Sequence, residues 1–200
     1  MYSRFRHRLS RLLKPHVRQF SLRWLEKIRK HELAIVEALI PPESTILEIG
    51  AGTGWQAQQL ADLGHDVVAI EIREDKEGAH EDYQKNQVFP VAGYDGATIP
   101  AKDNDFDVVF SSNVLEHIED VQGYQNEILR VLKDNGIAIH ILPSIWWRLL
   151  QTATEIVDRL AYAPNERIWQ PIRHGDRGTF LSEHYLFTAF AWKRLFRRTG

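Results

Sequence analysis

The middle of the chain alternates between short apolar runs and longer segments with helical or polar character. The runs lack the strict apolar–polar alternation of a half-exposed sheet, so we expect strands that are covered on both faces. The expected strands are Thr45–Ile49, His65–Ile72, Val88–Gly93, Phe106–Ser112 and Ile137–Leu142. The expected helices between them are Thr53–Leu63, the polar segment Arg73–Asn86 and Val121–Leu132. Strands that alternate with helices predict an α/β fold with a doubly wound, mostly parallel sheet.

The first 42 residues carry a different pattern and are expected to form a basic helical leader. Arginines separate apolar residues at near-helical spacing, and Pro15 is expected to divide this part into two helical pieces. A second apolar stripe ends at Pro41–Pro42, which predicts a helix stop, and its members are Leu25, Ile28, Ala34, Ile35 and Leu39. We therefore divide the chain into a leader, residues 1–42, and one domain, residues 43–200.

Composition sharpens this division. The net charge is −2, yet residues 1–30 hold ten Lys/Arg and one acid, so the body behind the leader is acidic. The absence of cysteine excludes disulfides, thiolate zinc sites and cysteine nucleophiles. No apolar run has the length of a membrane span, and arginines interrupt any signal-peptide core. These features fit a cytoplasmic protein.

The stretch "ILEIGAGTGW" (Ile46–Trp55) combines an apolar strand with a glycine-rich turn. Gly50, Gly52 and Gly54 follow the spacing G-x-G-x-G, one residue short of the dinucleotide fingerprint G-x-G-x-x-G. Glu48 would oppose a pyrophosphate on the next helix N-terminus. It would favour S-adenosylmethionine, which carries a sulfonium and an ammonium group. The turn therefore indicates S-adenosylmethionine rather than a nicotinamide or flavin cofactor.

Two further acids follow the next strands. Glu71 ends the second strand, nineteen residues after Gly52, where a carboxylate can accept hydrogen bonds from two ribose hydroxyls. Sites for NAD use an acid in the same way, so Glu71 alone does not choose between the cofactors. Asp95 follows the third strand, where it can meet an adenine amino group or simply form a turn.

In their order along the chain, these segments resemble the motifs of class I S-adenosylmethionine-dependent methyltransferases, especially the broad type 11 group. The resemblance spans about Glu43–Leu142 and rests on "ILEIGAGTG", "VVAIEI", "YDGATIPAKDNDFDVVFSSNVLEHI" and "ILRVLKDNGIAIHI". It implies that S-adenosyl-L-methionine is the cofactor. It also implies a helix and an antiparallel strand pair after the fifth strand. Because the sequence stops at Gly200, we expect the closing C-terminal strands to be missing.

The resemblance also assigns roles at the cofactor site. The backbone of Gly50, Ala51 and Gly52 would approach the methionine part, with Glu48 near its cationic groups. Glu71 would hold the ribose and Ile72 would pack on the adenine. Asp95 and Gly96 would meet the adenine edge, and the backbone of Ser112 would lie near the sulfonium. The second half of the leader, Phe20–Ile40, is expected to pack over this cleft with its apolar stripe inward.

Two histidines are candidates for catalysis. His117 in "LEHIED" could act as a general base near the transferred methyl group, or it could brace the following helix. Glu116, His117 and Asp120 do not complete a ligand set, so no metal site is expected. His174 lies in "RHGDRGTFLSEHY" (Arg173–Tyr185), the segment where this family builds a substrate lid. Its polar side chains could grip a polar or anionic substrate or belong to a solvated loop, and they are Arg173, His174, Arg177, Glu183 and His184.

We therefore expect a methyltransferase that acts on a small-molecule, sugar or lipid-linked acceptor. Two alternatives stay open: a module that binds S-adenosylmethionine without transfer, and a nicotinamide-dependent oxidoreductase. No nucleic-acid partner is expected, because the body is acidic and "SSNV" stands where base-flipping enzymes carry an N-P-P-Y-like tetrapeptide. The leader could form a lid, resemble a transit peptide, or let Met1–Lys14 touch an anionic membrane peripherally.

Overall fold

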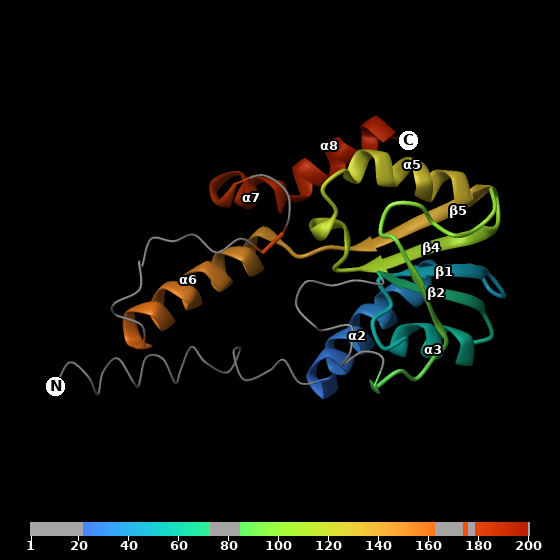
Figure 1. Cartoon of the computed structure of the whole chain (residues 1–200), viewed down its shortest axis with the longest axis horizontal. Helices are drawn as coiled ribbons and strands as arrows, with labels where there is room; N and C mark the ends of the chain where they lie inside the picture. Colours follow the sequence, from blue (N-terminus) through green and yellow to red (C-terminus); the bar gives the residue numbers. More distant parts are fainter. Residues whose placement is uncertain (1–21, 73–84, 163–173, 176–178, 200) are drawn as a thin grey trace.

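The chain folds around one parallel β-sheet with helices on both faces, as seen in the computed structural model in Figure 1. The structure describes residues 22–72, 85–162, 174–175 and 179–199. The expected break at Pro15 and most of the expected helix over Arg73–Asn86 lie outside these residues.

The sheet has five strands, all parallel, in the order β3-β2-β1-β4-β5. The strands are β1 (Thr45–Ile49), β2 (Asp66–Ile72), β3 (Val91–Tyr94), β4 (Phe106–Ser112) and β5 (Leu132–Ile141). The strand order reverses between β1 and β4, which creates a crevice at the carboxyl ends of these two strands. This topology confirms the prediction of a doubly wound, mostly parallel sheet.

The helices form a layer on each side of the sheet. Figure 1 shows α5 and α8 on one face and α2 and α3 on the other, while α6 projects beyond the end of the sheet. The α-helices are α2 (Leu22–Val36), α3 (Trp55–Asp62), α5 (Val121–Val131), α6 (Ile145–Tyr162), α7 (Phe180–Leu186) and α8 (Ala189–Thr199). Two short 3-10 turns complete the described elements, η2 (Glu37–Leu39) and η3 (Leu115–His117).

Side chains of the buried strands alternate between two cores. On β4, Val109 faces the cluster under α5 and α8, whereas Val108 and Phe110 face the cluster under α2 and α3. All three are fully buried. Both faces of the central strands are therefore apolar, which explains why the sequence shows continuous apolar runs there.

Helix α2 packs on the sheet with a different face from the one that the sequence predicts. Leu33, Val36 and Ile40 are buried against the sheet, while Ile35 and Leu39 are 71% and 57% exposed. The prediction of an inward stripe through Ile35 and Leu39 is therefore wrong. Both groups of apolar residues recur at helical spacing. Leu33, Val36 and Ile40 are the group that packs against the side chains of the strands and of α3.

Strand β5 starts earlier than expected and contains an irregularity. Phe106 pairs with Leu132 and Val108 with Ile137, so β5 uses five residues where β4 uses two. The residues Asp134–Gly136, which lie before the expected start of the strand, therefore belong to a bulge inside it. Among the described residues, β5 forms one edge of the sheet and no antiparallel strand pairs with it.

None of the described helices is both long and apolar enough to cross a membrane.

Candidate functional site

The glycine turn closes the carboxyl end of β1 in left-handed backbone conformations. Gly50, Gly52 and Gly54 have φ angles of +70°, +55° and +76°, which glycine adopts without steric cost. The N–H groups of Gly50 and Ala51 both donate to the carbonyl of Ile70 on β2, at 2.9 and 3.1 Å. A Cβ on Gly50 would collide with the side chain of Val114, which follows β4. The turn therefore lies directly against the segment after β4, across the crevice.

A cavity of about 330 Å³ lies at this end of the sheet. Six residues predicted for the cofactor site line it, namely Gly50, Ala51, Gly52, Glu71, Ile72 and Ser112. The cavity is also lined by residues of α2, α3, β3 and the segment after β4. They include Glu26, Arg29, Trp55, Gln56, Tyr94, Asn113, Val114, His117 and Ile118.

Glu71 links the second strand to the glycine turn. Its Oε2 accepts a hydrogen bond from the N–H of Gly52 at 2.8 Å, and its Oε1 accepts one from the N–H of Ile72 at 2.9 Å. A carboxylate has about four acceptor positions, so each oxygen retains one for a ligand. Glu71 can therefore hold the turn and accept two ribose hydroxyls at the same time.

The remaining predicted cofactor residues do not line the cavity. Oδ1 of Asp95 accepts hydrogen bonds from the N–H groups of Ala97 and Thr98, so this side chain stabilises its own turn. Gly96 has a φ of +80° and lies beside Ile72. A Cβ added to Gly96 would contact the Ile72 side chain at 3.5 Å. Direct contact of Asp95 and Gly96 with the adenine stays a prediction.

Glu48 is buried in β1, with only 2% of its surface exposed. Its Oε2 has no hydrogen-bond partner, and burial raises the pKa of the carboxyl to about 8, although the charge of Arg29 opposes this shift. A carboxyl with this pKa is mainly neutral near pH 7, so burial removes most of the negative charge that the sequence assigns to Glu48. The direct contact with the cofactor that the sequence suggested stays a prediction.

Helix α2 contributes polar residues that the sequence did not single out. Arg29 lines the cavity, pairs with Glu32 at 2.8 Å and donates a hydrogen bond to Oγ of Ser112 at the end of β4. Ser112 in turn donates to Glu32 at 2.8 Å. These contacts fasten the leader helix to the carboxyl end of β4. The signal in the sequence was the pair Arg29 and Glu32 at helical spacing, but their partner is eighty residues away.

The two candidate catalytic histidines meet beside the cavity. His117 lines the cavity, and its ring centroid lies 5.3 Å from that of His174. The ring of His174 also packs edge-on against Trp147 at 4.5 Å and near Phe187 at 6.0 Å. The structure thus brings together two histidines that lie 57 positions apart in the sequence.

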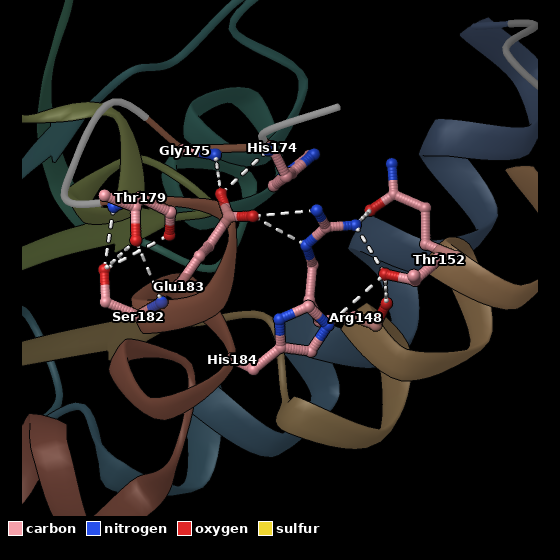
Figure 2. Close-up of polar contacts among 9 residues, drawn as sticks. Arg148, Thr152, His174, Gly175, Thr179, Ser182, Glu183 and His184 are labelled. Atoms are coloured by element: carbon pink, nitrogen blue, oxygen red, sulfur yellow. Dashed lines mark hydrogen bonds and ion pairs between the residues drawn. The ribbon is translucent and has the colours of Figure 1, made fainter. Parts of the chain in front are cut away.

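Glu183 fixes the position of His174, as Figure 2 shows. Its Oε1 accepts hydrogen bonds from the N–H groups of His174 and Gly175, at 2.8 and 2.6 Å. Its Oε2 pairs with the buried guanidinium of Arg148 on α6. The prediction that Glu183 grips a substrate is therefore wrong, because its carboxylate is buried and occupied. His184 lies against Thr152 on α6 and does not line the cavity, and Arg173 and Arg177 lie outside the described residues.

Glu116 lies beside this histidine pair. Its side chain is fully buried, and neither carboxylate oxygen has a hydrogen-bond partner. Burial raises the pKa of the carboxyl to about 7. One ligand atom from each of Glu116, His117 and His174 lies within 4.8 Å of the others. From the sequence, Glu116, His117 and Asp120 do not complete a ligand set and no metal site is expected. In the structure Asp120 caps α5 by accepting from the N–H of Gly123, and His174 takes its place beside the other two residues.

Comparison with known proteins places the central part of the chain among methyltransferase domains. Residues 47–140 match the family model of the methyltransferase domain. A ubiquinone biosynthesis O-methyltransferase of Rickettsia typhi is 36% identical over 118 residues, which cover 58% of this chain and 45% of that protein. A 2-methyl-6-phytyl-1,4-hydroquinone methyltransferase of Synechocystis is 32% identical over 102 residues, 50% of this chain and 32% of that protein. The chain thus matches less than half the length of these relatives.

Solved structures agree on the fold. This chain superposes on an S-adenosylmethionine-dependent methyltransferase of Thermotoga maritima with a TM-score of 0.57 and 23% identity. The superposition covers 97% of this chain and 80% of the Thermotoga chain. One from Aquifex aeolicus covers 84% and 78%, with a TM-score of 0.55 and 18% identity. Residues 47–140 therefore match a methyltransferase domain, and the chain has the fold of S-adenosylmethionine-dependent methyltransferases. The match and the fold indicate S-adenosylmethionine as the cofactor.

Proposed function

We propose that this domain transfers the methyl group of S-adenosylmethionine to a small-molecule acceptor with a largely apolar body. The observation that carries the proposal is the composition of one cavity. Glu71 and the glycine turn line it together with Val114, His117 and Ile118. The polar groups can orient the cofactor, and the apolar side chains can receive an acceptor beside it.

The names of relatives support an apolar acceptor. The Synechocystis relative is named for a phytyl hydroquinone, and the Rickettsia relative for ubiquinone biosynthesis. A third relative, 30% identical over 120 residues that cover 56% of this chain and 31% of its own, is the sterol 24-C-methyltransferase of Schizosaccharomyces pombe. The apolar wall formed by Val114 and Ile118, with Trp147 and Phe187 around the neighbouring His174, suits molecules of this kind.

The proposed reaction is a direct displacement. A nucleophilic atom of the acceptor bonds to the methyl carbon, the carbon–sulfur bond breaks, and its electron pair stays on sulfur to give S-adenosylhomocysteine. Holding the two reactants in line supplies much of the catalysis. A base is required only if the acceptor atom must lose a proton. His117 lines the cavity and would orient the reacting group of the acceptor, and the ring of His174 packs beside it.

A panel of acceptors tests this proposal. The full chain is incubated with methyl-labelled S-adenosylmethionine and either apolar phenols, hydroquinones and sterols or water-soluble amines and sugars. We expect label to enter the organic phase with the first group. Transfer to the water-soluble group alone would refute the apolar acceptor. Binding of the cofactor without transfer to either group would favour the binding module over the enzyme.

We also propose that Met1–Lys14 contacts anionic membranes, where apolar acceptors reside. Support comes from sequence alone, since this segment places arginines among apolar residues and lies outside the described residues. Each Lys or Arg near an anionic surface contributes about 1 kcal/mol of binding free energy. Sedimentation with anionic liposomes should carry down the intact chain and spare a chain that starts at Phe20. Equal behaviour of the two chains would leave the leader as a solvated lid.

A further inference from the structure

We propose that Glu116, His117 and His174 bind a divalent transition-metal ion of the Zn²⁺ type beside the cofactor cavity. The three residues come from two distant parts of the chain, the turn η3 and the segment between α6 and α7. One ligand atom from each lies within 4.8 Å of the others, and Oε1 of Glu116 lies 4.0 Å from Nε2 of His117. The site follows from these distances, and only its role in transfer rests on the proposed function.

Glu116 provides the second observation that points to a ligand. Its side chain has no exposed surface, yet both carboxylate oxygens lack a hydrogen-bond partner. A buried polar group without a partner is unfavourable, and native structures rarely keep two on one side chain. An ion between the carboxylate and the two imidazoles would satisfy these oxygens.

The donor set suits zinc better than the harder cations. Two histidine nitrogens and one glutamate oxygen form a ligand set found in catalytic zinc sites, in which a fourth position stays open. Metal–ligand distances in such sites are about 2.0–2.2 Å, so neighbouring ligand atoms are roughly 3.4 Å apart. The side chains here must therefore close by about 1 Å around an ion. His117 is 45% exposed and has room to do so.

The backbone that carries His174 is held in place by a buried carboxylate, which limits where its ring can lie. Its backbone N–H and that of Gly175 both donate to Glu183, whose other oxygen pairs with Arg148 (Figure 2). Gly175 also packs on the carbonyl of Glu116, where a Cβ would come within 2.5 Å of the oxygen. This close approach brings the His174 segment against the turn that carries Glu116 and His117.

The local charges allow a cation at this position. Arg29 is the nearby positive group that acts on Glu116, and it would repel an ion. It is already paired with Glu32 at 2.8 Å, so the two charges largely offset each other. The ion would therefore meet one uncompensated carboxylate and two imidazoles.

The ion would act on the acceptor because His117 also lines the cavity. A hydroxyl bound at the open position loses its proton more readily, since a Lewis acid stabilises the alkoxide or phenolate. That oxygen then forms a bond to the methyl carbon while the carbon–sulfur bond breaks and sulfur keeps the electron pair. The proton from the hydroxyl leaves to solvent or buffer. The proposal thus specifies an oxygen acceptor for the transfer reaction.

Cobalt binding tests the site without any activity measurement. The full chain is stripped with a chelator and titrated with Co²⁺, whose visible absorption reports a four-coordinate nitrogen–oxygen site. We expect one saturable site, and at least a tenfold loss of affinity in each of Glu116→Gln, His117→Gln and His174→Gln. The matched control is His184→Gln on α7, which should retain full affinity. Circular dichroism checks that each variant is folded.

Two results would overturn the proposal. One is the absence of a Co²⁺ signal in the parent chain, and the other is a signal that all three variants retain, since other histidines would then bind the ion. Metal dependence of the reaction is measured separately with labelled cofactor. Cobalt binding without any methyl transfer would contradict the proposed function and support the metal site. Methyl transfer by a chain that binds no cobalt would support the proposed function and contradict the metal site.

Discussion

The carboxylate of Glu71 at the end of β2 accepts a hydrogen bond from the backbone N–H of Gly52 in the glycine turn, at 2.8 Å. The same side chain accepts from the N–H of Ile72 through its other oxygen. The acid that the sequence assigns to a ribose therefore also holds the turn on which the methionine part would lie. One side chain couples two parts of the cofactor site.

The first prediction follows from this coupling. Glu71→Ala leaves the Gly52 N–H and the ribose hydroxyls without their acceptor, and a hydrogen bond to a charged group contributes roughly 1.5–3 kcal/mol. We expect S-adenosylhomocysteine to bind about tenfold more weakly or worse, with the fold intact, in calorimetric titration. Asp134→Ala, an exposed acid in the bulge of β5, is the control and should bind normally. Unchanged affinity in Glu71→Ala would remove this residue from the site.

A second prediction concerns the approach of the glycine turn to β4. Gly50→Ala forces a side chain into a positive φ, at about 1–2 kcal/mol, and drives its Cβ into Val114, at about 1–3 kcal/mol more. Gly64→Ala is the matched control, because Gly64 has φ +94° and no atom within 4 Å of an added Cβ. Urea unfolding should show a larger loss for Gly50→Ala, and only this variant should lose cofactor affinity. Equal losses would mean that the contact with Val114 is unimportant.

The third prediction is a pH dependence of stability through Glu48. Burial raises the pKa of its carboxyl from 4.5 to about 8. The protonated carboxyl contributes its full share to folding stability below pH 4.5. This share is lost as the pH rises to about 8, because the unfolded chain releases its proton at a lower pH than the folded chain. Glu48→Gln removes this loss. Relative to the parent chain, the variant should gain on the order of 2–4 kcal/mol of unfolding free energy between about pH 5 and pH 8.5. A constant difference across this range would show that Glu48 is already ionised in the folded protein.

The fourth prediction concerns the buried pair that holds His174. Arg148 and Glu183 are fully buried and pair at 2.8 Å, so Glu183→Gln leaves a buried guanidinium without its counter-charge. Breaking such a pair costs about 3–5 kcal/mol of unfolding free energy. The double variant Arg148→Met/Glu183→Gln should recover much of this loss, since the glutamine oxygen can still accept from His174 and Gly175. Additive losses in the two single variants and the double variant, measured by urea unfolding, would contradict an interacting pair.

Much of the fold could be predicted because its signals are local. The bounds of β1 and β4 were predicted correctly, since both are short, mainly apolar runs covered on both faces. The inward face of α2 could not be chosen in the same way. Two stripes on that helix have the same period, and only the shape of the core under it selects Leu33 and Val36 over Ile35 and Leu39.

The residues of the site also differ in whether a local signal in the sequence predicts them. Residues at strand ends, such as Glu71 and Ser112, could be predicted because parallel strands bring their carboxyl ends together. The contact of Arg29 with Ser112 spans 83 positions and has no local signal. The meeting of His117 and His174 depends on Glu183, a residue that looks from the sequence like a polar substrate contact. Its role becomes visible only when its buried partner Arg148 is known.

The central claim is that the cavity beside Glu71 and the glycine turn takes S-adenosylmethionine and not a dinucleotide. Calorimetric titration of the full chain with S-adenosylmethionine and with NAD under the same conditions tests it most directly. We predict saturable binding of S-adenosylmethionine at one site per chain, with no comparable affinity for NAD, because the turn has the spacing G-x-G-x-G and not the dinucleotide spacing G-x-G-x-x-G. Binding of NAD as tight as or tighter than that of S-adenosylmethionine would contradict the account.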